Sequence, residues 1–329
     1  MKKRMLVISS AALVAALLFV SGLIFGSVDL TPPEILRGLF TGEGKSGVIV
    51  RSLRLPRVTA ALLSGMALAT SGVLLQSATD NDLAAPNTVG INSGAGAAFM
   101  LSLCFFPDLY YLGGVFAFLG AILAAVLTLL IARATGEDMK RTSVVLSGVC
   151  VGALFGAVIS YLSLRFPDAL SSYAVFSVGG YAGIYMKELT LPLILIPTLT
   201  VMAFLLSGRL NLLALGDDLA GSLGARVGLL RTAAVTLAAA LASVSVSFAG
   251  LVGFVGLIAP HISRRLVGSD KRYLIPMSAI VGASLTTLSD TLGRVLFSPT
   301  EMPSGIILSL VGAPFFLALL LGKRKGEYK

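Results

Sequence analysis

Apolar residues along the chain gather in long runs that contain no Asp, Glu, Lys or Arg. A helix needs about 20 such residues to cross the roughly 30 Å of bilayer hydrocarbon. The run at 232–263 has 32 residues, too many for one crossing, so we expect a break near Gly250, Gly253 and Gly256. With that break the pattern predicts ten membrane-spanning helices, at 5–28, 58–79, 83–107, 109–132, 142–164, 189–208, 232–249, about 251–267, 273–289 and 302–322.

Composition agrees with an all-α polytopic membrane protein. Of the 329 residues, 56% are hydrophobic and 12% are charged, and the mean hydropathy is +0.93. Because soluble domains carry roughly 25% charged residues, the composition excludes a soluble enzyme, a nucleic-acid-binding domain and a disordered chain. The apolar run at 5–28 is long for a signal-peptide core, so it is interpreted as the first span. We expect one transmembrane domain over residues 1–329.

Basic residues flank the apolar runs, and their distribution predicts the orientation. Cytoplasmic loops of membrane proteins carry an excess of Lys and Arg. With ten spans and a cytoplasmic N-terminus, 17 of the 25 basic residues lie on the cytoplasmic side; without a span at 251–267 the count is 10. We therefore expect both termini in the cytoplasm. Residues 165–188 then form an outer segment, whose uncharged part, 169–186, is too polar and glycine-rich to cross.

Few ionisable residues lie within the predicted spans. The only histidine, His261, is near the cytoplasmic end of one span, and Asp290 is at the outer end of another. Proton-driven carriers use buried acids or histidines, so proton coupling is disfavoured, whereas sodium coupling through backbone carbonyls stays open. An intramembrane hydrolase would have only His261 as its base. We expect no catalytic, cofactor-binding or metal-binding residue in this chain.

Residues 44–46 (GKS) look like the end of a phosphate-binding loop. That motif requires a glycine five residues before Gly44, and Leu39 stands there, with no strand before it. We therefore expect that the chain itself does not bind ATP.

A cluster of basic residues at the predicted outer mouth runs against the expected orientation. Arg51, Arg54 and Arg57 recur every three residues before the second span, and Arg294 follows the ninth. An acidic protein that docks from outside would account for them, because complementary charge steers association. The alternative is that these side chains simply extend to the membrane interface.

The cytoplasmic loop at 208–231 is too polar to span and too rich in leucine for a plain linker. Glycines at 216, 221 and 224 divide it into two predicted short helices, and Asp217 with Asp218 suits the N-terminus of the second. Such a helix pair could enter a partner's groove, or it could lie on the membrane surface. Thr142 and Ser143, in the inner turn Lys140-Arg141-Thr142-Ser143 at the entry of the fifth span, could line a gate, but from the pattern alone Thr142 is better interpreted as a helix cap.

Six segments of the chain resemble the FecCD family, the permease subunits of ATP-binding-cassette (ABC) importers for iron–siderophore complexes, haem and cobalamin. They cover nearly the whole chain in family order: RLPRVTAALLSGMALATSGVLLQ (54–76), NDLAAPNTVGINSGAGAAF (81–99), LNLLALGDDLAGSLGARV (210–227), AGLVGFVGLIAPHISRRLVGSDKR (249–272), LSDTLGR (288–294) and EMPSGIILSLVGAPFF (301–316).

The resemblance implies a multi-pass protein of a prokaryotic cytoplasmic membrane, with ten spans. It implies as partners a second permease copy or relative, two ATPase subunits that bind ATP and Mg²⁺, an external binding protein and membrane lipid, with no nucleic acid. By position, Arg54, Arg57 and Arg294 correspond to the family's docking arginines, and Thr142 and Ser143 to the inner gate. The ATPase-coupling residues implied in the same way are Leu215, Gly216, Asp217, Asp218, Leu219, Ala220, Gly221, Leu223 and Gly224.

Three short departures from the family pattern stand out. The usual NPLA is Asn81-Asp82-Leu83-Ala84, and the usual Asp-His-Arg is Asp270-Lys271-Arg272. The region Tyr173 to Gly180, where many members carry a tryptophan, has none. The competing functional class is a secondary transporter driven by an ion gradient, which predicts uptake without any ATPase.

Overall fold

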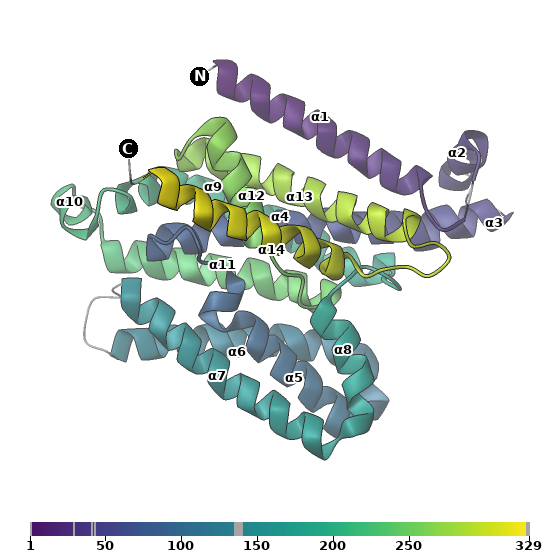
Figure 1. Cartoon of the computed structure of the whole chain (residues 1–329), viewed down its shortest axis with the longest axis horizontal. Helices are drawn as coiled ribbons and strands as arrows, with labels where there is room; N and C mark the ends of the chain where they lie inside the picture. The colour runs from purple at the N-terminus through teal and green to yellow at the C-terminus, as the bar shows by residue number, and fades with distance from the viewer. Residues whose placement is uncertain (1, 29, 41, 43, 135–140, 327–329) are drawn as a thin grey trace.

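The computed structural model describes residues 2–28, 30–40, 42, 44–134 and 141–326, and within these ranges it consists of helices and their connecting turns (Figure 1). The long helices are α1 (Lys2–Ile24), α4 (Leu55–Thr79), α5 (Ile91–Phe105), α6 (Gly113–Ala134), α7 (Arg141–Arg165), α9 (Thr190–Leu213), α11 (Val227–Ala249), α12 (Val255–Val267), α13 (Lys271–Val295) and α14 (Ser304–Gly326). The short ones are α2 (Pro32–Phe40), α3 (Gly44–Gly47), α8 (Leu170–Val178) and α10 (Asp217–Ser222).

Each predicted span overlaps one of the long helices. In the described part of the chain, six segments are long and apolar enough to cross a membrane: 2–24, 44–79, 107–134, 142–165, 186–213 and 227–249. The chain is therefore an all-helical integral membrane protein. The predicted outer segment at 169–186 contains α8, whose nine residues are too few for a crossing.

The long apolar run at 232–263 breaks where a break was expected. α11 ends at Ala249 and α12 begins at Val255, and between them Gly250 and Phe254 have φ values of +68° and +66°. Gly256, also predicted at the break, lies instead in the first turn of α12. There a Cβ on Gly72 of α4 would come within 2.0 Å of the Gly256 carbonyl oxygen, so these two glycines let the helices touch.

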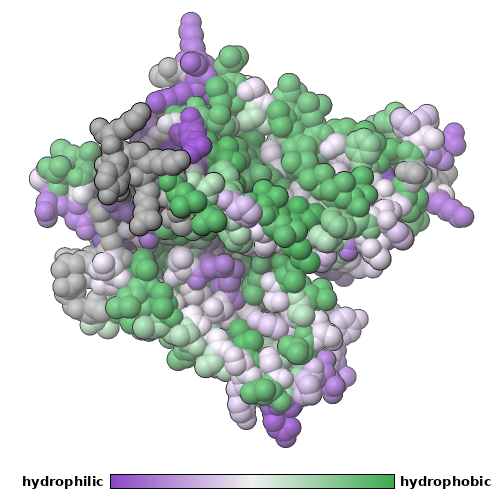
Figure 2. Space-filling view, viewed as in Figure 1, coloured by the Kyte–Doolittle hydropathy of each residue, from purple (hydrophilic) through white to green (hydrophobic). Residues whose placement is uncertain are grey.

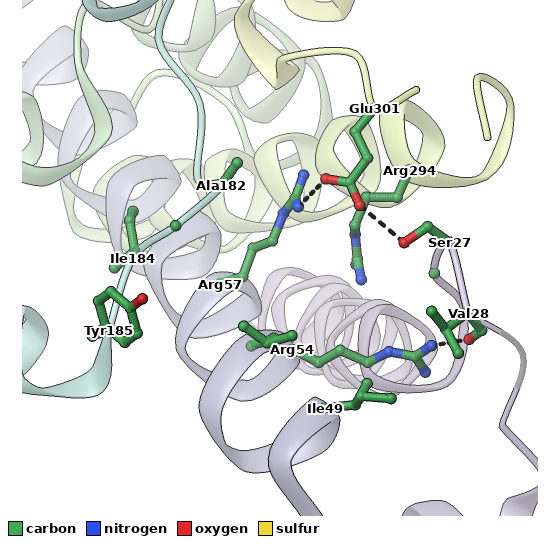
Figure 3. A pocket seen from close by; sticks show the side chains of 13 residues that line it. Ser27, Val28, Ile49, Arg54, Arg57, Ala182, Ile184, Tyr185, Arg294 and Glu301 are labelled. Atoms are coloured by element: carbon green, nitrogen blue, oxygen red, sulfur yellow. Dashed lines mark hydrogen bonds and ion pairs between the residues drawn. The ribbon is translucent and has the colours of Figure 1, made fainter. Parts of the chain in front are cut away.

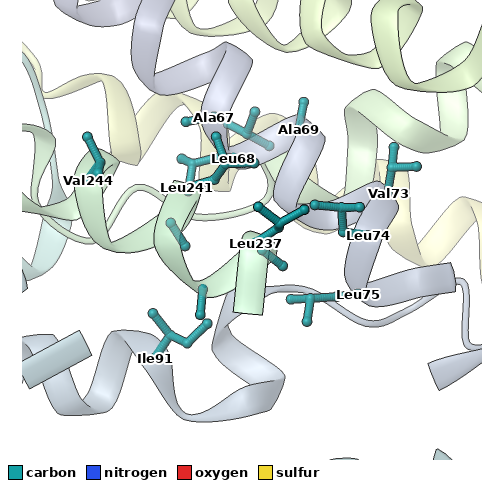
Figure 4. Packing of buried hydrophobic residues seen from close by; sticks show 14 of the residues in the cluster. Ala67, Leu68, Ala69, Val73, Leu74, Leu75, Ile91, Leu237, Leu241 and Val244 are labelled. Atoms are coloured by element: carbon teal, nitrogen blue, oxygen red, sulfur yellow. The ribbon is translucent and has the colours of Figure 1, made fainter. Parts of the chain in front are cut away.

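Helix α4 occupies the centre of the bundle. Its apolar side chains pack against Leu237, Leu241 and Val244 of α11 in one continuous buried cluster (Figure 4). On another side it meets α13, where a Cβ on Gly65 would approach the Gly282 carbonyl oxygen to 2.2 Å. Close contact between small residues stabilises helix pairs inside a membrane. Movement of α4 would therefore displace α11, α12 and α13 together.

The glycines of α7, at 148, 152 and 156, form only partly a packing surface. A Cβ on Gly148 would lie 2.5 Å from the Thr88 carbonyl oxygen, and one on Gly90 would lie 3.0 Å from the Gly148 carbonyl oxygen, so the backbones are in close contact there. A Cβ on Gly94 would be 2.4 Å from Gly120 on α6. Gly156, in contrast, has nothing within 4 Å, so this chain does not explain it.

The two ends of the bundle carry different features. Figure 1 places both termini and α10 toward one end, and α2 and α3 toward the other. Following the predicted orientation, we name these the inner end and the outer end. Figure 2 shows apolar side chains over most of the body between them, with hydrophilic ones concentrated toward the extremities.

Candidate functional site

Arg54 closes the C-terminus of α1 at the outer end. The last carbonyl groups of a helix have no partner within the helix, and a cation there also interacts favourably with the helix dipole. Arg54 is 4% exposed, and its Nη1 donates to the carbonyl oxygens of Leu23 and Ile24 at 2.8 and 2.6 Å. Its Nη2 donates to the Val28 carbonyl oxygen. The guanidinium is therefore a structural cap inside the chain.

Arg294 performs the same task from α13. It is 3% exposed, and its two Nη atoms donate to the Phe25 and Gly22 carbonyl oxygens at 3.1 and 2.9 Å. Arg51 caps α2 in a similar way, donating to the carbonyl oxygens of Leu39 and Phe40 at 2.9 and 2.8 Å. Three of the outer arginines thus neutralise helix C-termini, which accounts for basic residues on the outer side.

Arg57 is held by carboxylates. Its Nε donates to the two Asp290 carboxylate oxygens at 3.0 and 3.1 Å, and its Nη1 contacts Glu301 (Figure 3). Asp290 also lies 3.1 Å from Nε of Arg294, so this buried carboxylate sits between two guanidinium groups. Ser27 donates to Glu301 at 3.1 Å. Partial burial would raise the pKa of Glu301, but the hydrogen bond and positive charge of Arg57, with the Ser27 hydroxyl, lower it below its ordinary value.

The structure brings Arg54, Arg57 and Arg294 together, as the docking hypothesis requires. They line a cavity of about 270 Å³, together with Tyr185 and Glu301 (Figure 3). However, Arg54 and Arg294 direct their guanidinium groups to carbonyl oxygens inside the chain, whereas the Arg57 side chain is 12% exposed and pairs with the 30% exposed Glu301. Sequence reasoning could not detect this, since the capped carbonyls belong to residues about 30 to 270 positions away. The docking role remains a prediction.

A second outer cavity, of about 280 Å³, adjoins the first. Arg57, Ala182 and Glu301 line both cavities, so the Arg57–Glu301 pair stands between them. The second cavity is aromatic, because Phe99 and Phe176 stack with ring centroids 3.9 Å apart.

At the inner end the predicted pair of short helices is a single helix, α10. Helix α9 continues to Leu213 and α11 begins at Val227, so both flanks of the loop extend the neighbouring long helices. Gly216 and Gly224 bound the connection with φ values of +93° and +81°, which favour glycine. Asp217 and Asp218 do form the first turn of α10, as predicted.

The segment at 215–224, for which a coupling role is predicted, presents leucines outward. Leu219 and Leu223 are 60% and 63% exposed, Leu215 is 50% exposed, and Ala220 is buried against the bundle. These three leucines, here called the leucine ridge, are spaced by four residues. A cavity of about 390 Å³ beside α10 is lined by Arg209, Arg226 and further leucines. The geometry suits insertion into an apolar groove.

One residue of this region was missed by sequence reasoning. Arg231 of α11 is 1% exposed; its Nε donates to the Ala78 carbonyl oxygen at 2.7 Å, and its Nη2 lies 2.9 Å from Oδ1 of Asp217. In the sequence it looked like one more cytoplasmic cation. No local signal distinguished it from the other basic residues that flank apolar runs.

Thr142 and Ser143 lie in the first turn of α7, Thr142 exposed and Ser143 buried. Because α7 already includes Arg141, Thr142 is inside the helix, and the interpretation of Thr142 as the cap is wrong. Lys140, the first residue of the predicted gate turn, lies outside the described residues. The gate role stays a prediction.

The model of the FecCD transport family matches residues 13–322. The chain belongs to this family. It is 37% identical over 323 residues to the Fe(3+)-citrate import system permease protein YfmE of Bacillus subtilis strain 168, covering 97% of this chain and 96% of YfmE. It is 39% identical over 325 residues to the achromobactin transport system permease protein CbrC of Dickeya dadantii strain 3937, covering 96% and 91%.

Among solved structures, the FecCD chain is similar to a transporter assigned to the metal-chelate ABC type, in an inward-facing conformation. The TM-score is 0.83 at 30% sequence identity, with 96% of this chain and 98% of that chain covered. The family resemblance inferred from the six sequence segments is therefore confirmed.

Two departures from the FecCD motifs lie close together at the inner end. Asp82, in place of the usual proline, pairs with Arg264 of α12, which also donates to Oε1 of Gln76 at 2.9 Å. Lys271, in place of the usual histidine, interacts electrostatically with both Arg264 and Asp82. Burial and the charge of Arg264 lower the pKa of Lys271 to about 8, against the opposing effect of Asp82 and Asp80. The loop after α4 is therefore held to α12 by charge.

Proposed function

We propose that this chain is the membrane-spanning permease subunit of an ABC importer that takes up a metal chelate. The family match over residues 13–322 carries the proposal, and relatives named for ferric citrate and achromobactin import indicate the substrate class. Iron–siderophore complexes, haem and cobalamin-type chelates are the candidates. The complete importer would contain a second permease copy or relative, two ATPase subunits that bind ATP and Mg²⁺, and an external binding protein.

The proposed topology has ten crossings, by α1, α4, α5, α6, α7, α9, α11, α12, α13 and α14, with both termini in the cytoplasm of a prokaryotic cell. The common position of both termini and α10 at one end supports an even number of crossings (Figure 1). Cysteine labelling at 45 and 325 in intact cells tests it, because the two positions should react from opposite sides.

At the inner end, we assign the segment from Leu215 to Gly224 to contact with the ATPases. The exposed leucine ridge supports this assignment, since nothing in the described chain covers it. ATP-driven closure of the ATPases would displace α10, and the bundle would alternate between outward-open and inward-open states. Thr142 and Ser143 would then lie at the inner gate.

At the outer end, the proposed docking contact centres on Arg57. An acidic side chain of the binding protein would compete with Glu301 for the Arg57 guanidinium at the rim of the two cavities. Arg54 and Arg294 would contribute by holding the end of α1 and by adding positive potential beneath the rim.

Reconstitution tests the proposed function. Vesicles that contain this chain with its ATPase and binding protein should take up ⁵⁵Fe-citrate or a ⁵⁵Fe-siderophore in an ATP-dependent manner, with haem and cyanocobalamin as competing substrates. Vesicles with the chain alone should take up none of the four. Uptake by the chain alone under a sodium or proton gradient would establish the secondary-transporter alternative instead.

A further inference from the structure

A single buried arginine joins the coupling helix to the centre of the bundle. Arg231 lies in the second turn of α11, with its side chain withdrawn from solvent. One nitrogen donates to the Ala78 carbonyl oxygen at 2.7 Å, and another lies 2.9 Å from the Asp217 carboxylate. Ala78 is in the last turn of α4, and Asp217 is the first residue of α10.

This geometry requires the planar shape of a guanidinium. The Ala78 carbonyl is among the groups that a helix C-terminus leaves without an internal partner. A guanidinium presents donors in several fixed directions, so it can satisfy that carbonyl and the Asp217 carboxylate at the same time. A lysine ammonium on a flexible stem is a point charge and does not fix the two acceptors relative to each other.

Glycines stand on both sides of α10. Gly216 and Gly224 have positive φ values, and a Cβ built on either would meet nothing within 4 Å. Gly221, within the helix, is equally open. Because glycine backbones rotate easily, a displacement of α10 would reach the bundle mainly through side-chain contacts, among them the buried Ala220 and the Asp217–Arg231 pair.

The far side of this contact is α4, the most buried long helix among the residues that the structure describes. α4 touches α12 and α13 through glycine contacts and packs along α11. A displacement passed to the end of α4 thus reaches three other long helices. A displacement that stayed within the loop between α9 and α11 would not reach them.

We propose that Arg231 is the positioning residue that makes α10 and α4 move as one unit, so that displacement of α10 is transmitted to the centre of the bundle. The mechanical connection concerns this chain alone. The identity of the partner that displaces α10 rests on the proposed function.

The first experiment measures the connection in the chain alone. Spin labels at Ser222 on α10 and Leu83 beyond the end of α4, in a background without Cys104 and Cys150, report the distance distribution between the two elements in lipid nanodiscs. We expect a narrow distribution in the parent and a broad one in Arg231→Met and Asp217→Asn. Arg133→Met is the matched control, because Arg133 is an inner-end arginine that contacts α11 at Thr232, 3.4 Å away; it should leave the distribution narrow.

The second experiment measures transmission in the complete importer as chelate transported per ATP hydrolysed. Arg231→Met should lower this ratio at least about fivefold, the lower end of typical coupling factors, while ATP hydrolysis continues. Arg231→Lys should recover only part of the loss, and Arg133→Met should match the parent. A merely structural role would lower the amount of folded protein without changing the ratio.

The outcomes separate the two proposals. Unchanged distances in both variants, or broadened distances with an unchanged transport ratio, would overturn the role of Arg231. If Arg231→Met does not fold, Asp217→Asn decides by the same two criteria. Deletion of residues 215–224 tests the coupling assignment itself, and survival of ATP-driven transport after that deletion would overturn it.

Discussion

The outer and inner ends of the bundle differ in how their unusual residues are satisfied. At the outer end, Arg51, Arg54 and Arg294 donate to carbonyl oxygens at the C-termini of α2 and α1. At the inner end, the leucine ridge of the α10 region is exposed. The outer cations are explained within the chain, whereas the inner leucines are not. Basic residues on the predicted outer side are thus weaker evidence for a partner protein than an exposed apolar surface is.

The largest expected effect comes from removing the leucine ridge. Replacing Leu215, Leu219 and Leu223 by serine should reduce ATP-dependent chelate uptake at least about tenfold, because buried apolar anchors dominate interface energies. The melting temperature of the chain should change little, since the side chains are exposed. Co-purification of the ATPase measures assembly, and full assembly of the serine variant would favour the membrane-surface alternative.

The next effect concerns the stability of the outer end. Arg294→Met leaves Asp290 with Arg57 alone and removes two donors from the end of α1. Breaking a buried ionic contact typically costs about 3–5 kcal/mol, so denaturant unfolding in micelles should show a loss of that size. Arg51→Met, at an exposed cap, should cost only about 1 kcal/mol. Equal losses would contradict the contrast between buried and exposed caps.

A smaller effect is expected for docking at the rim. Glu301→Gln should tighten association with the binding protein by about three- to tenfold, and Arg57→Gln should weaken it, because the glutamate competes for that guanidinium. Asp168→Asn removes one exposed acid, on the turn before α8, and serves as the control. Titrations at low and high salt should show the Arg57 effect shrinking with ionic strength. If Glu301→Gln instead weakened association with the binding protein, Glu301 would contribute to docking and would not compete for Arg57.

The smallest effect is a pH dependence at the inner end. Burial would raise the pKa of Asp270, but the amide of Asn211 at 2.8 Å, the Arg272 N–H at 3.0 Å and the charges of Arg272 and Arg4 lower it overall. A lowered folded-state pKa gives stability that is present above about pH 4 and is lost as pH falls through the folded value.

Asp270→Asn should therefore remove part of the stability change in that acidic range, amounting to about 1 kcal/mol, the size of a helix cap. Thermal unfolding in micelles between pH 3 and pH 6 measures it. Glu34→Gln, at the outer end, provides a comparison, because the pKa of Glu34 is also lowered, by hydrogen bonds from Thr31. An identical pH profile for Asp270→Asn and the parent would contradict the assignment.

Local patterns predicted much of the fold. The apolar runs located the long helices, the glycines near 250 located the end of α11, and the acidic pair located the first turn of α10. These features depend on residues that are neighbours in sequence, because hydrogen bonds within a helix and the flexibility of glycine are local properties. The family segments identified the transport class for the same reason: each is a short continuous motif.

The sequence alone could not reveal which polar groups meet across the bundle. By itself the sequence determined where helices form and that they belong in a membrane, since both follow from composition and spacing. Only the tertiary structure decided that Arg54 and Arg294 close α1 and that Arg231 joins α10 to α4. The reason is physical: a helix end needs donors or acceptors from elsewhere, and any distant arginine that packs there can supply them.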